Sequence, residues 1–324
     1  MTSQQARAFW VTSPGHGAIR DEALPVAGAD DASVRTLFSG VSRGTESLVF
    51  TGAVPDTERE RMRAPYQAGE FPAPVKYGYC NVGQVESGPE AFVGRRVFSL
   101  FPHQTRFVVP ASALHLLPDA VPAGRAVLAA NMETAVNGVW DAAVQPGDRV
   151  AVIGAGAVGC LVAWLAGQIP GTEVCLVDVN PSRAAVADAL GVSFALPGDA
   201  PGERDLVIHA SGSPDGLVTA LRLCAFESTV VELSWFGSRQ VALPLGEGFH
   251  AKRLTIRASQ VGQIATSHRA RWDYRRRMEL ALSLLSDPAL DVLITGESRF
   301  EDLPLVMKAL SDGSRDAICH RLTY

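Results

Sequence analysis

Residues 149–159 read RVAVIGAGAVG, and the apolar segment LVAWLAGQI follows at 161–169. The glycines at 154, 156 and 159 form a G-x-G-x-x-G between a strand-like run and a helix-like run. The next apolar run, CLVDV, contains Asp178, which lies 19 residues after Gly159 (178 − 159). Strand, glycine turn, helix, second strand and acidic residue in this order predict a dinucleotide-binding unit. A glycine turn in an ordinary α/β unit is the alternative.

Each glycine of this pattern has a separate physical task. Gly154 allows a sharp turn off the strand, Gly156 lets a diphosphate approach the backbone, and Gly159 lets the helix pack closely against the sheet. The helix begins at Ala157 and Val158, and the amides of its first turn carry a partial positive charge that favours phosphate groups. We therefore expect these five residues to bind the cofactor's diphosphate.

Asp178 predicts which dinucleotide is bound. Its carboxylate can accept hydrogen bonds from the two hydroxyls of the adenosine ribose, and the same charge repels a 2′-phosphate. NAD is therefore expected in preference to NADP. Arg183 lies five residues further on and is a candidate to weaken that preference, because a guanidinium attracts phosphate.

Strand-like and helix-like segments alternate after residue 148. The predicted strands are 149–154, 173–179, 192–195, 205–210, 229–235 and 254–259, and the predicted helices are 157–169, 181–190 and 215–224. Asn180 suits the N-cap and Pro181 the first turn of the second of these helices. The alternation predicts an α/β fold with a doubly wound parallel sheet, which is a Rossmann domain.

Three parts of the chain are expected. Residues 1–125 consist of short apolar runs broken by glycine and proline, which predicts a β-rich domain with a surface loop or a short exposed helix at 55–74. Residues 126–264 are expected to form the NAD-binding domain. The tail, 265–324, is expected to return to the first domain and to form a helix at 269–285, a strand at 289–297, a helix at 300–313 and a final strand at 317–324.

The composition is that of a globular protein. Of 324 residues, 47% are apolar and 19% are charged, and the net charge of −5 offers no basic surface for nucleic acid. No apolar run reaches the ~18–20 residues that cross a bilayer, and residues 1–13 lack the apolar stretch of a signal peptide. The five cysteines form no C-x-x-C pair, which favours a reducing cytoplasm over disulfides or a structural zinc.

Nearly the whole chain resembles the medium-chain dehydrogenase/reductase superfamily. Residues 39–52, SGVSRGTESLVFTG, resemble its first signature loop, and residues 76–85, KYGYCNVGQV, resemble its G-H-E-x-x-G-x-V segment. Residues 94–110 resemble a strand pair that ends in VVP, and GDRV at 147–150 precedes the glycine turn as in the family. The resemblance implies a β-rich GroES-like catalytic domain beside the Rossmann domain, an NAD(P)-dependent oxidoreductase and a homodimer.

The sequence departs from the zinc-binding members at each catalytic ligand position. The cysteine of the first loop is replaced by Ser42 or Arg43, depending on a one-residue gap, and the histidine of G-H-E is replaced by Tyr79. The third position falls near Ala130. Catalytic zinc takes three thiolate, imidazole or carboxylate ligands, so the resemblance implies a zinc-free enzyme. Residues 98–107 also lack the four-cysteine lobe for structural zinc.

Within the superfamily, SGVSRGTE at 39–46 and Tyr79 resemble the dehydrogenase of bacteriochlorophyll synthesis. That enzyme acts on a hydroxyethyl side chain with NAD. The resemblance extends to the subgroup and leaves the substrate of this chain open.

Without zinc, side chains have to hold the substrate's oxygen and move its proton. Tyr79 is the first candidate, because a phenol donates to a carbonyl oxygen, or takes a proton if its pKa is lowered; a structural tyrosine is the alternative. Ser42 either hydrogen-bonds the substrate's oxygen or is a turn serine. Arg43 either contacts the cofactor's diphosphate or an oxyanion, or forms a surface salt bridge.

Two further catalytic candidates are His103 and Glu133. His103 suits a proton relay because histidine titrates near neutrality, and a structural histidine is the alternative. Glu133 either acts as a base or is a carboxylate satisfied by amides at a helix start. Thr134 beside it resembles a residue near the nicotinamide in the family. Glu46 is expected as a first-turn carboxylate with a weaker claim to catalysis.

The arginines between Arg269 and Arg277, with Trp272 and Tyr274 among them, are expected on a solvated helix face. A clamp for an anionic substrate or a subunit contact is the alternative. The aromatic residues are too few to indicate a nucleic-acid site.

The sequence therefore predicts a cytoplasmic, zinc-independent oxidoreductase that passes a hydride between NAD(H) and a small alcohol or carbonyl substrate in a cleft between its domains. Two alternatives stay open. One is reduction of a carbon–carbon double bond next to a carbonyl, as in zinc-free quinone and enoyl reductases, which mostly use NADPH and which Asp178 disfavours. The other is NAD binding without net redox turnover, in a lyase, an epimerase or a structural protein.

Overall fold

The structure is a computed structural model that describes residues 5–324, and it divides into two compact units. Unit 1 consists of the described residues up to Ala130, together with Leu282–Ser286 and Ile294–Tyr324. Unit 2 consists of Asn131–Ala281 and Asp287–Leu293. The division differs from the predicted domains in the tail, because residues 265–281 are part of unit 2.

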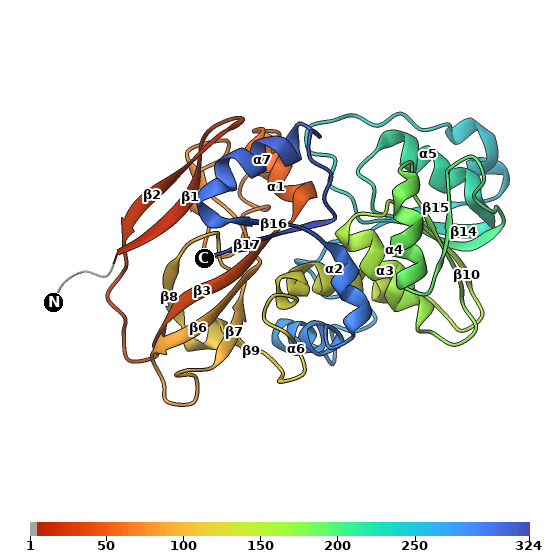
Figure 1. Ribbon diagram of the computed structural model, residues 1–324. Coiled ribbons are helices and arrows are strands. Elements are labelled where there is room, and N and C mark those ends of the chain that lie inside the picture. The colour runs from red at the N-terminus through yellow and green to blue at the C-terminus, as the bar shows by residue number, and fades with distance from the viewer. Residues whose placement is uncertain (1–4) are drawn as a thin grey trace. The chain divides into compact units, whose positions relative to one another are not determined.

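Unit 2 is built on one sheet of six parallel strands (Figure 1). Their order across the sheet is β12 (Ser193–Ala195), β11 (Glu173–Val177), β10 (Arg149–Ile153), β13 (Arg204–His209), β14 (Cys224–Glu232) and β15 (Thr255–Ala258). Every neighbouring pair is parallel. β10 is the point at which the strand order reverses. The chain first adds β11 and β12 on one side of β10 and then adds β13, β14 and β15 on the other side. The predicted doubly wound sheet is confirmed.

Three helices of unit 2 follow strands as the alternation predicts, namely α3 (Ala157–Gly167), α4 (Ala184–Ala189) and α5 (Pro214–Leu223). Two more are α2 (Ala129–Ala142), which begins at the end of unit 1, and α6 (Tyr274–Leu284), which ends in unit 1. Four residues of β10 are buried, as expected of a central parallel strand covered on both faces. Leu217 and Leu221, one turn apart on α5, share a core cluster with Ala151 of β10 and Val207 of β13.

Local capping decides where several of these elements begin. Asn180 accepts a hydrogen bond from the Ser182 amide at 3.0 Å, and Pro181 opens the short helix that leads into α4, as predicted. The predicted helix from 269 begins only at Tyr274. Asp273 explains this start, because its carboxylate accepts the Arg276 amide at 2.8 Å, which is the geometry of an N-cap.

Unit 1 contains two sheets, as expected of a β-rich domain. The smaller sheet has the order β2 (His16–Ala23), β1 (Gln5–Ser13), β5 (Val75–Lys76) and β4 (Ala68–Gly69). The larger has the order β16 (Ile294–Arg299), β17 (Cys319–Thr323), β3 (Asp31–Val41), β6 (Asn81–Ser87), β7 (Arg96–Ser99) and β9 (His115–Leu116), and β8 (Arg106–Pro110) also pairs with β3. Its helices are α1 (Arg43–Phe50) and α7 (Leu303–Ser311).

Short helical turns complete the two units. They are Asp56–Glu58, Ala111–Ala113, Ala126–Leu128, Pro181–Arg183, Leu245–Phe249, Pro288–Leu293 and Phe300–Asp302. The strand predicted at 289–297 is therefore partly wrong, since its first half is helical. Asp287 explains the difference, because its carboxylate accepts the Ala289 amide at 2.9 Å and starts a turn.

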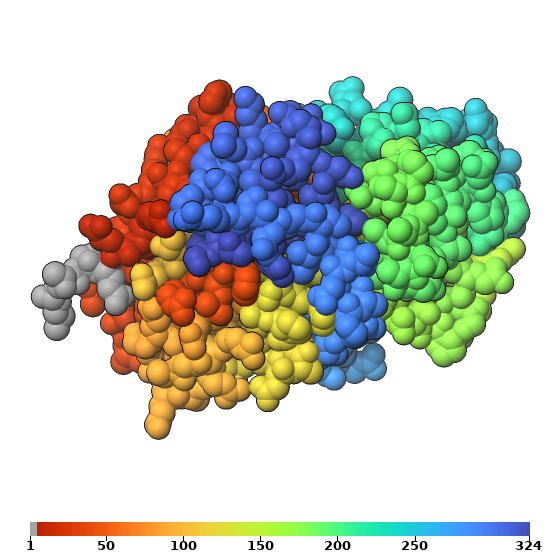
Figure 2. Space-filling model, viewed as in Figure 1, coloured from red at the N-terminus to blue at the C-terminus, as the bar shows by residue number. Residues whose placement is uncertain are grey.

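The end of the chain returns to unit 1. β17 pairs antiparallel with β3 and parallel with β16, and α7 packs against α1 and β2. Figure 2 shows this blue C-terminal segment packed over the red N-terminal strands of the same unit. The fold thereby places Tyr324, next to the end of β17, close to residues of β3. Within residues 5–324, no helix has the length and apolar character needed to cross a membrane.

Candidate functional site

The glycine turn of unit 2 has the geometry of a diphosphate cradle. Gly154 follows β10 with a φ of 105°, a conformation that side chains strongly disfavour, and a Cβ there would lie 2.6 Å from the Ser211 Cα. A Cβ on Gly159 would collide with the carbonyl oxygen of Gly154, so this glycine lets α3 approach the turn. A Cβ on Gly156 would meet nothing within 4 Å, which leaves open space above the turn.

The first turn of α3 faces this open space. Gly156 is extended and forms the N-cap, and α3 begins at Ala157 and Val158, which are only half-buried. The first amides of a helix have no carbonyl partner within that helix, and the helix dipole adds positive charge there. These groups therefore suit a diphosphate.

Asp178 is fixed beside the glycine turn by two backbone amides. Its carboxylate accepts the Ala155 amide at 2.6 Å and the Asn180 amide at 2.8 Å, one on each oxygen. Each carboxylate oxygen has a second lone-pair direction, so two acceptor positions are left for a diol. Arg183 ends the turn Pro181–Arg183 that leads into α4 and is half-buried.

The catalytic candidates of unit 1 form a cluster around Glu46. Its carboxylate accepts the Ser42 amide at 2.8 Å and, on its other oxygen, lies 2.8 Å from the His103 Nε2. Glu46 and His103 are almost fully buried, with 4% and 1% of their surface exposed. A buried carboxylate is stable only when it is well hydrogen-bonded. Glu46 therefore fixes the loop before α1 to the segment that carries His103.

The cluster continues from His103 to the last residue of the chain. The His103 Nδ1 lies 2.7 Å from the Ser39 hydroxyl, which in turn lies 2.8 Å from the Tyr324 hydroxyl. Burial raises the pKa of Tyr324 far above its usual value. Ser39 belongs to β3 and is completely buried. The hydrogen-bonded chain Glu46–His103–Ser39–Tyr324, called here the Glu46 network, thus links four separate segments of unit 1.

Tyr79 joins this region through Ser42. The Ser42 side chain forms a hydrogen bond with the Tyr79 hydroxyl, and the ring of Tyr77 packs edge-on against the ring of Tyr79 at 5.9 Å. Burial, reinforced by Tyr77, Cys80 and Glu46, raises the pKa of Tyr79 well above its usual value. The phenol therefore keeps its proton at neutral pH. This geometry suits a hydrogen-bond donor and does not supply the lowered pKa that a tyrosine base needs.

The donor set of the described residues does not fit zinc. No group of three histidine, cysteine, aspartate or glutamate side chains in residues 5–324 is arranged to hold a metal ion. Cys80 lies beside Tyr79, but burial, with Glu46 and Cys319 adding to it, raises the pKa of its thiol well above the usual value.

The remaining candidate of unit 1, Arg43, lies on the surface. Its guanidinium is 3.3 Å from the Asp316 carboxylate, and both side chains are about half exposed, at 47% and 48%. This is the surface salt bridge that the sequence left open as an alternative. An exposed pair of this kind contributes roughly 0–1 kcal/mol.

Glu133 belongs to α2 in unit 2 and is paired with Arg277 of α6. The Arg277 Nε donates to the Glu133 carboxylate at 3.1 Å, and the two side chains are only 2% and 7% exposed. Burial raises the pKa of Glu133, and the charge and hydrogen bond of Arg277 partly offset this. The carboxylate is thus held by an arginine and not by helix-start amides. Thr134 follows it on α2 and is half-buried.

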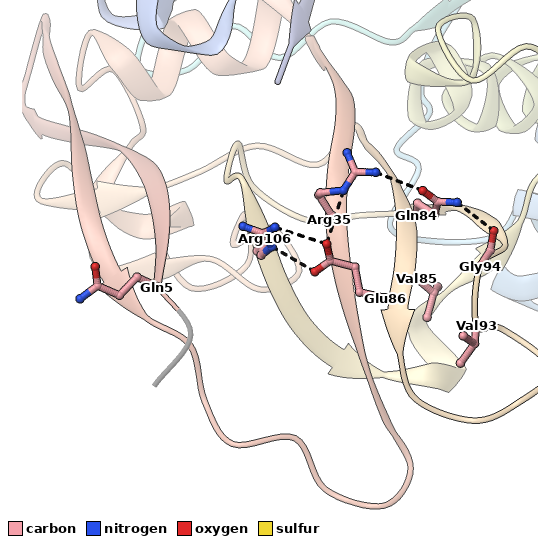
Figure 3. A pocket seen from close by; sticks show the side chains of 8 residues that line it. All are labelled: Gln5, Arg35, Gln84, Val85, Glu86, Val93, Gly94 and Arg106. Atoms are coloured by element: carbon pink, nitrogen blue, oxygen red, sulfur yellow. Dashed lines mark hydrogen bonds and ion pairs between the residues drawn. The ribbon is translucent and has the colours of Figure 1, made fainter. Parts of the chain in front are cut away.

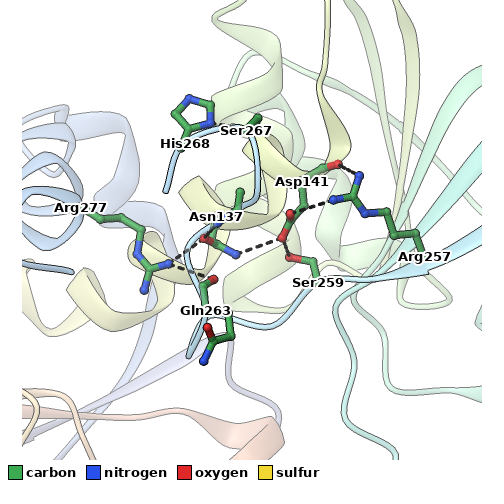
Figure 4. Close-up of polar contacts among 9 residues, drawn as sticks. Asn137, Asp141, Arg257, Ser259, Gln263, Ser267, His268 and Arg277 are labelled. Atoms are coloured by element: carbon green, nitrogen blue, oxygen red, sulfur yellow. Dashed lines mark hydrogen bonds and ion pairs between the residues drawn. The ribbon is translucent and has the colours of Figure 1, made fainter. Parts of the chain in front are cut away.

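The prediction that the arginines of this segment lie on a solvated helix face is wrong for Arg277, which is buried. It donates to the Val261 carbonyl at 2.6 Å. It also donates to the Asn137 side chain at 2.6 Å, and Asn137 in turn donates to Asp141 (Figure 4). Its role is to fasten the segment before α6 to α2. Arg276 is exposed as predicted, and its guanidinium stacks over Trp272 at 3.8 Å.

A polar surface depression in unit 1 lies outside these clusters. Figure 3 shows Arg35 and Arg106 pointing toward Glu86. The Arg35 Nε and the Arg106 Nε lie 3.4 Å and 3.0 Å from the Glu86 carboxylate. One carboxylate thus pairs with two arginines that are about 40% exposed, and Arg35 also contacts Gln84. Each arginine already has a partner, so this depression is not a candidate active site.

Glu46 was predicted as a first-turn carboxylate and lies in the first turn of α1, while Ser39 and Tyr324 were not among the predicted site residues. The four-residue spacing from Ser42 to Glu46 across a helix start was a usable signal, because side chains in the first turn reach back to the N-cap amide. No local pattern connects Ser39 with Tyr324, which are 285 residues apart.

The chain is similar to known dehydrogenases over most of its length, although no protein-family model matches it. D-guloside 3-dehydrogenase of Escherichia coli is 26% identical over 292 residues, which cover 81% of this chain and 83% of that protein. L-idonate 5-dehydrogenase of E. coli has a TM-score of 0.80 at 15% identity, covering 100% of this chain and 99% of that one. The E. coli alcohol dehydrogenase rspB, solved with NADH, has a TM-score of 0.76 at 18% identity and covers 99% of both chains. These likenesses confirm the α/β fold.

Proposed function

We propose that this protein is an NAD(H)-dependent oxidoreductase that interconverts an alcohol and a carbonyl compound without zinc. The observation that carries the proposal is the arrangement of Gly154, the start of α3 and Asp178 in one cradle. A glycine turn alone is common in α/β folds, but here a fixed carboxylate with two remaining acceptor positions adjoins it. Diphosphate next to a ribose diol is the chemistry that this combination recognises.

The cofactor would be held by the residues of this cradle. Amides of Ala157, Val158 and Gly159 would take the diphosphate, and Asp178 the adenosine ribose, with Arg183 and Thr134 as further candidates. The bound nicotinamide supplies the hydride acceptor or donor. Asp178 favours NAD, because its charge repels a 2′-phosphate and its lone pairs need donors.

The proton is handled by Tyr79, in our proposal. Its raised pKa keeps the phenol protonated, so Tyr79 donates to the substrate's carbonyl oxygen and gives up its proton as the oxyanion develops. Ser42 orients that hydroxyl, and the Glu46–His103 pair fixes the backbone of Ser42. Glu46 and His103 are therefore positioning residues. Arg43 and Glu133 are weaker candidates for a catalytic role, because both already have ionic partners.

Zinc independence is supported by the donor set at the loops that resemble the zinc-site loops. Ser42, Tyr79 and Ala130 supply none of the usual ligands. A homodimer is part of the proposal on the strength of the resemblance alone.

For the substrate, two classes of secondary alcohol have support. The similarity to D-guloside 3-dehydrogenase favours a hydroxyl of a sugar or polyol. The resemblance of residues 39–46 favours a hydroxyethyl group on a large flat ring. Both reactions oxidise a CH–OH group, so the same cofactor chemistry serves them.

The test is a spectrophotometric screen of the purified full-length chain. Sugar glycosides, polyols and aryl ethanols are added with NAD, and absorbance of the reduced nicotinamide is followed. One class is expected to produce NADH, with NADP far less effective. A substrate panel of enones run with NADH and NADPH separates double-bond reduction. Tight NADH binding with turnover of substrate but no net absorbance change would contradict the oxidoreductase and favour a non-redox role.

A further inference from the structure

A second buried network lies in unit 2, at the carboxyl ends of β13 and β14. His209 ends β13, Glu232 ends β14, and Ser211 lies two residues beyond His209. The His209 Nδ1 is 2.7 Å from the Glu232 carboxylate, and its Nε2 is 2.6 Å from the Ser211 hydroxyl. The imidazole is completely buried, while Ser211 is exposed. A buried histidine thus connects a carboxylate to a surface hydroxyl.

The network fixes the direction of the Ser211 hydrogen bond. An ionised carboxylate only accepts, so the His209 Nδ1 carries the proton toward Glu232, which also accepts the Ser234 amide at 2.6 Å. In the neutral imidazole, whose Nδ1 carries the proton, the His209 Nε2 accepts the hydrogen of the Ser211 hydroxyl. The Ser213 amide donates to the Ser211 oxygen at 3.1 Å and takes one of its lone pairs. The exposed Ser211 oxygen is therefore an acceptor that suits a hydroxyl better than an ionised phosphate.

The position of Ser211 matters as much as its chemistry. β13 is the neighbour of β10 on the side away from β11, and the Ser211 Cα would lie 2.6 Å from a Cβ on Gly154. Ser211 and Asp178 therefore flank the glycine turn on opposite sides. Open α/β sheets bind ligands at such a point, outside the carboxyl ends of the strands. Two hydrogen-bond acceptors, the Asp178 carboxylate and the Ser211 oxygen, thus lie on the two sides of the glycine turn.

A dinucleotide has the matching arrangement, with one ribose on either side of a diphosphate. We propose that Ser211 accepts a hydrogen bond from a hydroxyl of the second ribose, the one that carries the nicotinamide. His209 and Glu232 act as positioning residues that keep the Ser211 hydrogen turned away from the ligand. This inference rests on the proposed function, because it requires the cradle to bind a dinucleotide.

The test is a binding series by calorimetry with three ligands and the full-length chain. ADP has the diphosphate and the adenosine only, ADP-ribose adds the second ribose, and NADH adds the nicotinamide. The variant Ser211→Ala is expected to weaken ADP-ribose and NADH about fivefold each, the value of one neutral hydrogen bond of ~1 kcal/mol. ADP binding is expected to stay within about twofold of wild type.

Two matched variants sharpen this series. Ser211→Thr keeps the oxygen and is expected to retain wild-type affinities for all three ligands. Ser213→Ala removes a hydroxyl from the same loop that caps no helix amide, and it is expected to change none of them. His209→Gln is expected to weaken ADP-ribose and NADH without weakening ADP, and thermal melting shows whether this variant remains folded.

Each outcome bears on one proposal. Equal weakening of ADP by Ser211→Ala, a loss for NADH without one for ADP-ribose, or no loss at all would overturn the assignment of Ser211 to the ribose. If the wild-type chain binds none of the three ligands, the dinucleotide cradle itself fails and the proposed function with it. Tight wild-type binding with an unaffected Ser211→Ala variant overturns only the present inference.

Discussion

Asp178 accepts two backbone amides, so its carboxylate is held in place beside Gly154. Preorganisation of this kind lowers the entropy that binding has to overcome. At the residue scale, the proposed preference for NAD therefore depends on one fixed charge, which accepts hydrogen bonds from ribose hydroxyls and repels a 2′-phosphate.

Replacing this charge gives the first prediction. Asp178→Ala is expected to weaken NAD and NADH roughly tenfold to a hundredfold, because hydrogen bonds to a charged group contribute about 1.5–3 kcal/mol. NADP and NADPH should lose less, since the variant also removes repulsion of the 2′-phosphate. Calorimetric titration of the four cofactors measures this. Asp188→Ala, on the exposed side of α4, is the control, and equal losses for all four cofactors would contradict the role of Asp178.

The second prediction concerns the proton. Tyr79→Phe is expected to reduce kcat by a factor of about 10²–10⁴, the range of general acid–base catalysis, and to leave NADH affinity unchanged. Tyr77→Phe is the matched control, because it removes a hydroxyl from the neighbouring tyrosine, whose ring packs against the ring of Tyr79. Steady-state kinetics with the substrate found in the screen and NADH titration measure the two effects. A Tyr79→Phe enzyme with wild-type kcat would assign the proton donor elsewhere.

At the scale of elements, α2 and α6 are held together by one buried ion pair. Arg277→Met leaves Glu133 charged and without its partner, and the expected loss of unfolding free energy is about 3–5 kcal/mol. The double variant Glu133→Leu/Arg277→Met removes both charges and should lose much less. Urea unfolding measures this. Arg275→Met, whose exposed pair with Glu279 is worth little, is the control, and a double variant as unstable as Arg277→Met alone would contradict the argument.

β17 carries a buried histidine that should make the stability of unit 1 depend on pH. Burial lowers the pKa of His320 to about 4, since the charged ring is poorly solvated beside Arg315. The unfolded chain then binds more protons than the folded one between pH 6.5 and about 4, so stability falls as the pH falls through this window. Urea unfolding of wild type and His320→Gln from pH 7 to pH 4 should differ increasingly. The exposed His16→Gln is the control, and parallel curves for wild type and His320→Gln would refute the assignment.

At the scale of the whole molecule, the absence of zinc ligands at the resembling loops gives a prediction about composition. Metal analysis of the purified full-length chain is expected to find well under one zinc per chain. Turnover should survive prolonged treatment with a chelator, because no step in the proposal uses a metal. A known zinc dehydrogenase treated in parallel shows that the chelator works. Stoichiometric zinc that is required for turnover would overturn the metal-free proposal.

The strongest sequence predictions were those that depend on neighbours in the chain. The turn at Gly154, the N-cap at Asn180 and the parallel strands each follow from residues within one short segment, because backbone conformation and capping are local properties. The start of α6 was missed by five residues, since the capping by Asp273 was overlooked in an arginine-rich run. The contact of Glu46 with His103 was not predicted, because the two residues lie 57 positions apart in the chain.

The sequence by itself determined the order of elements, the glycine turn and the carboxylate of Asp178 beside it, since these depend on contacts within one β–α–β segment. Only the tertiary structure decided which polar groups are buried together. Glu133 and Arg277 are 144 residues apart, and Ser39 and Tyr324 are 285 apart. Such pairs form when folding brings distant strands and helices side by side, and no local pattern in the chain records which buried charge will meet which partner.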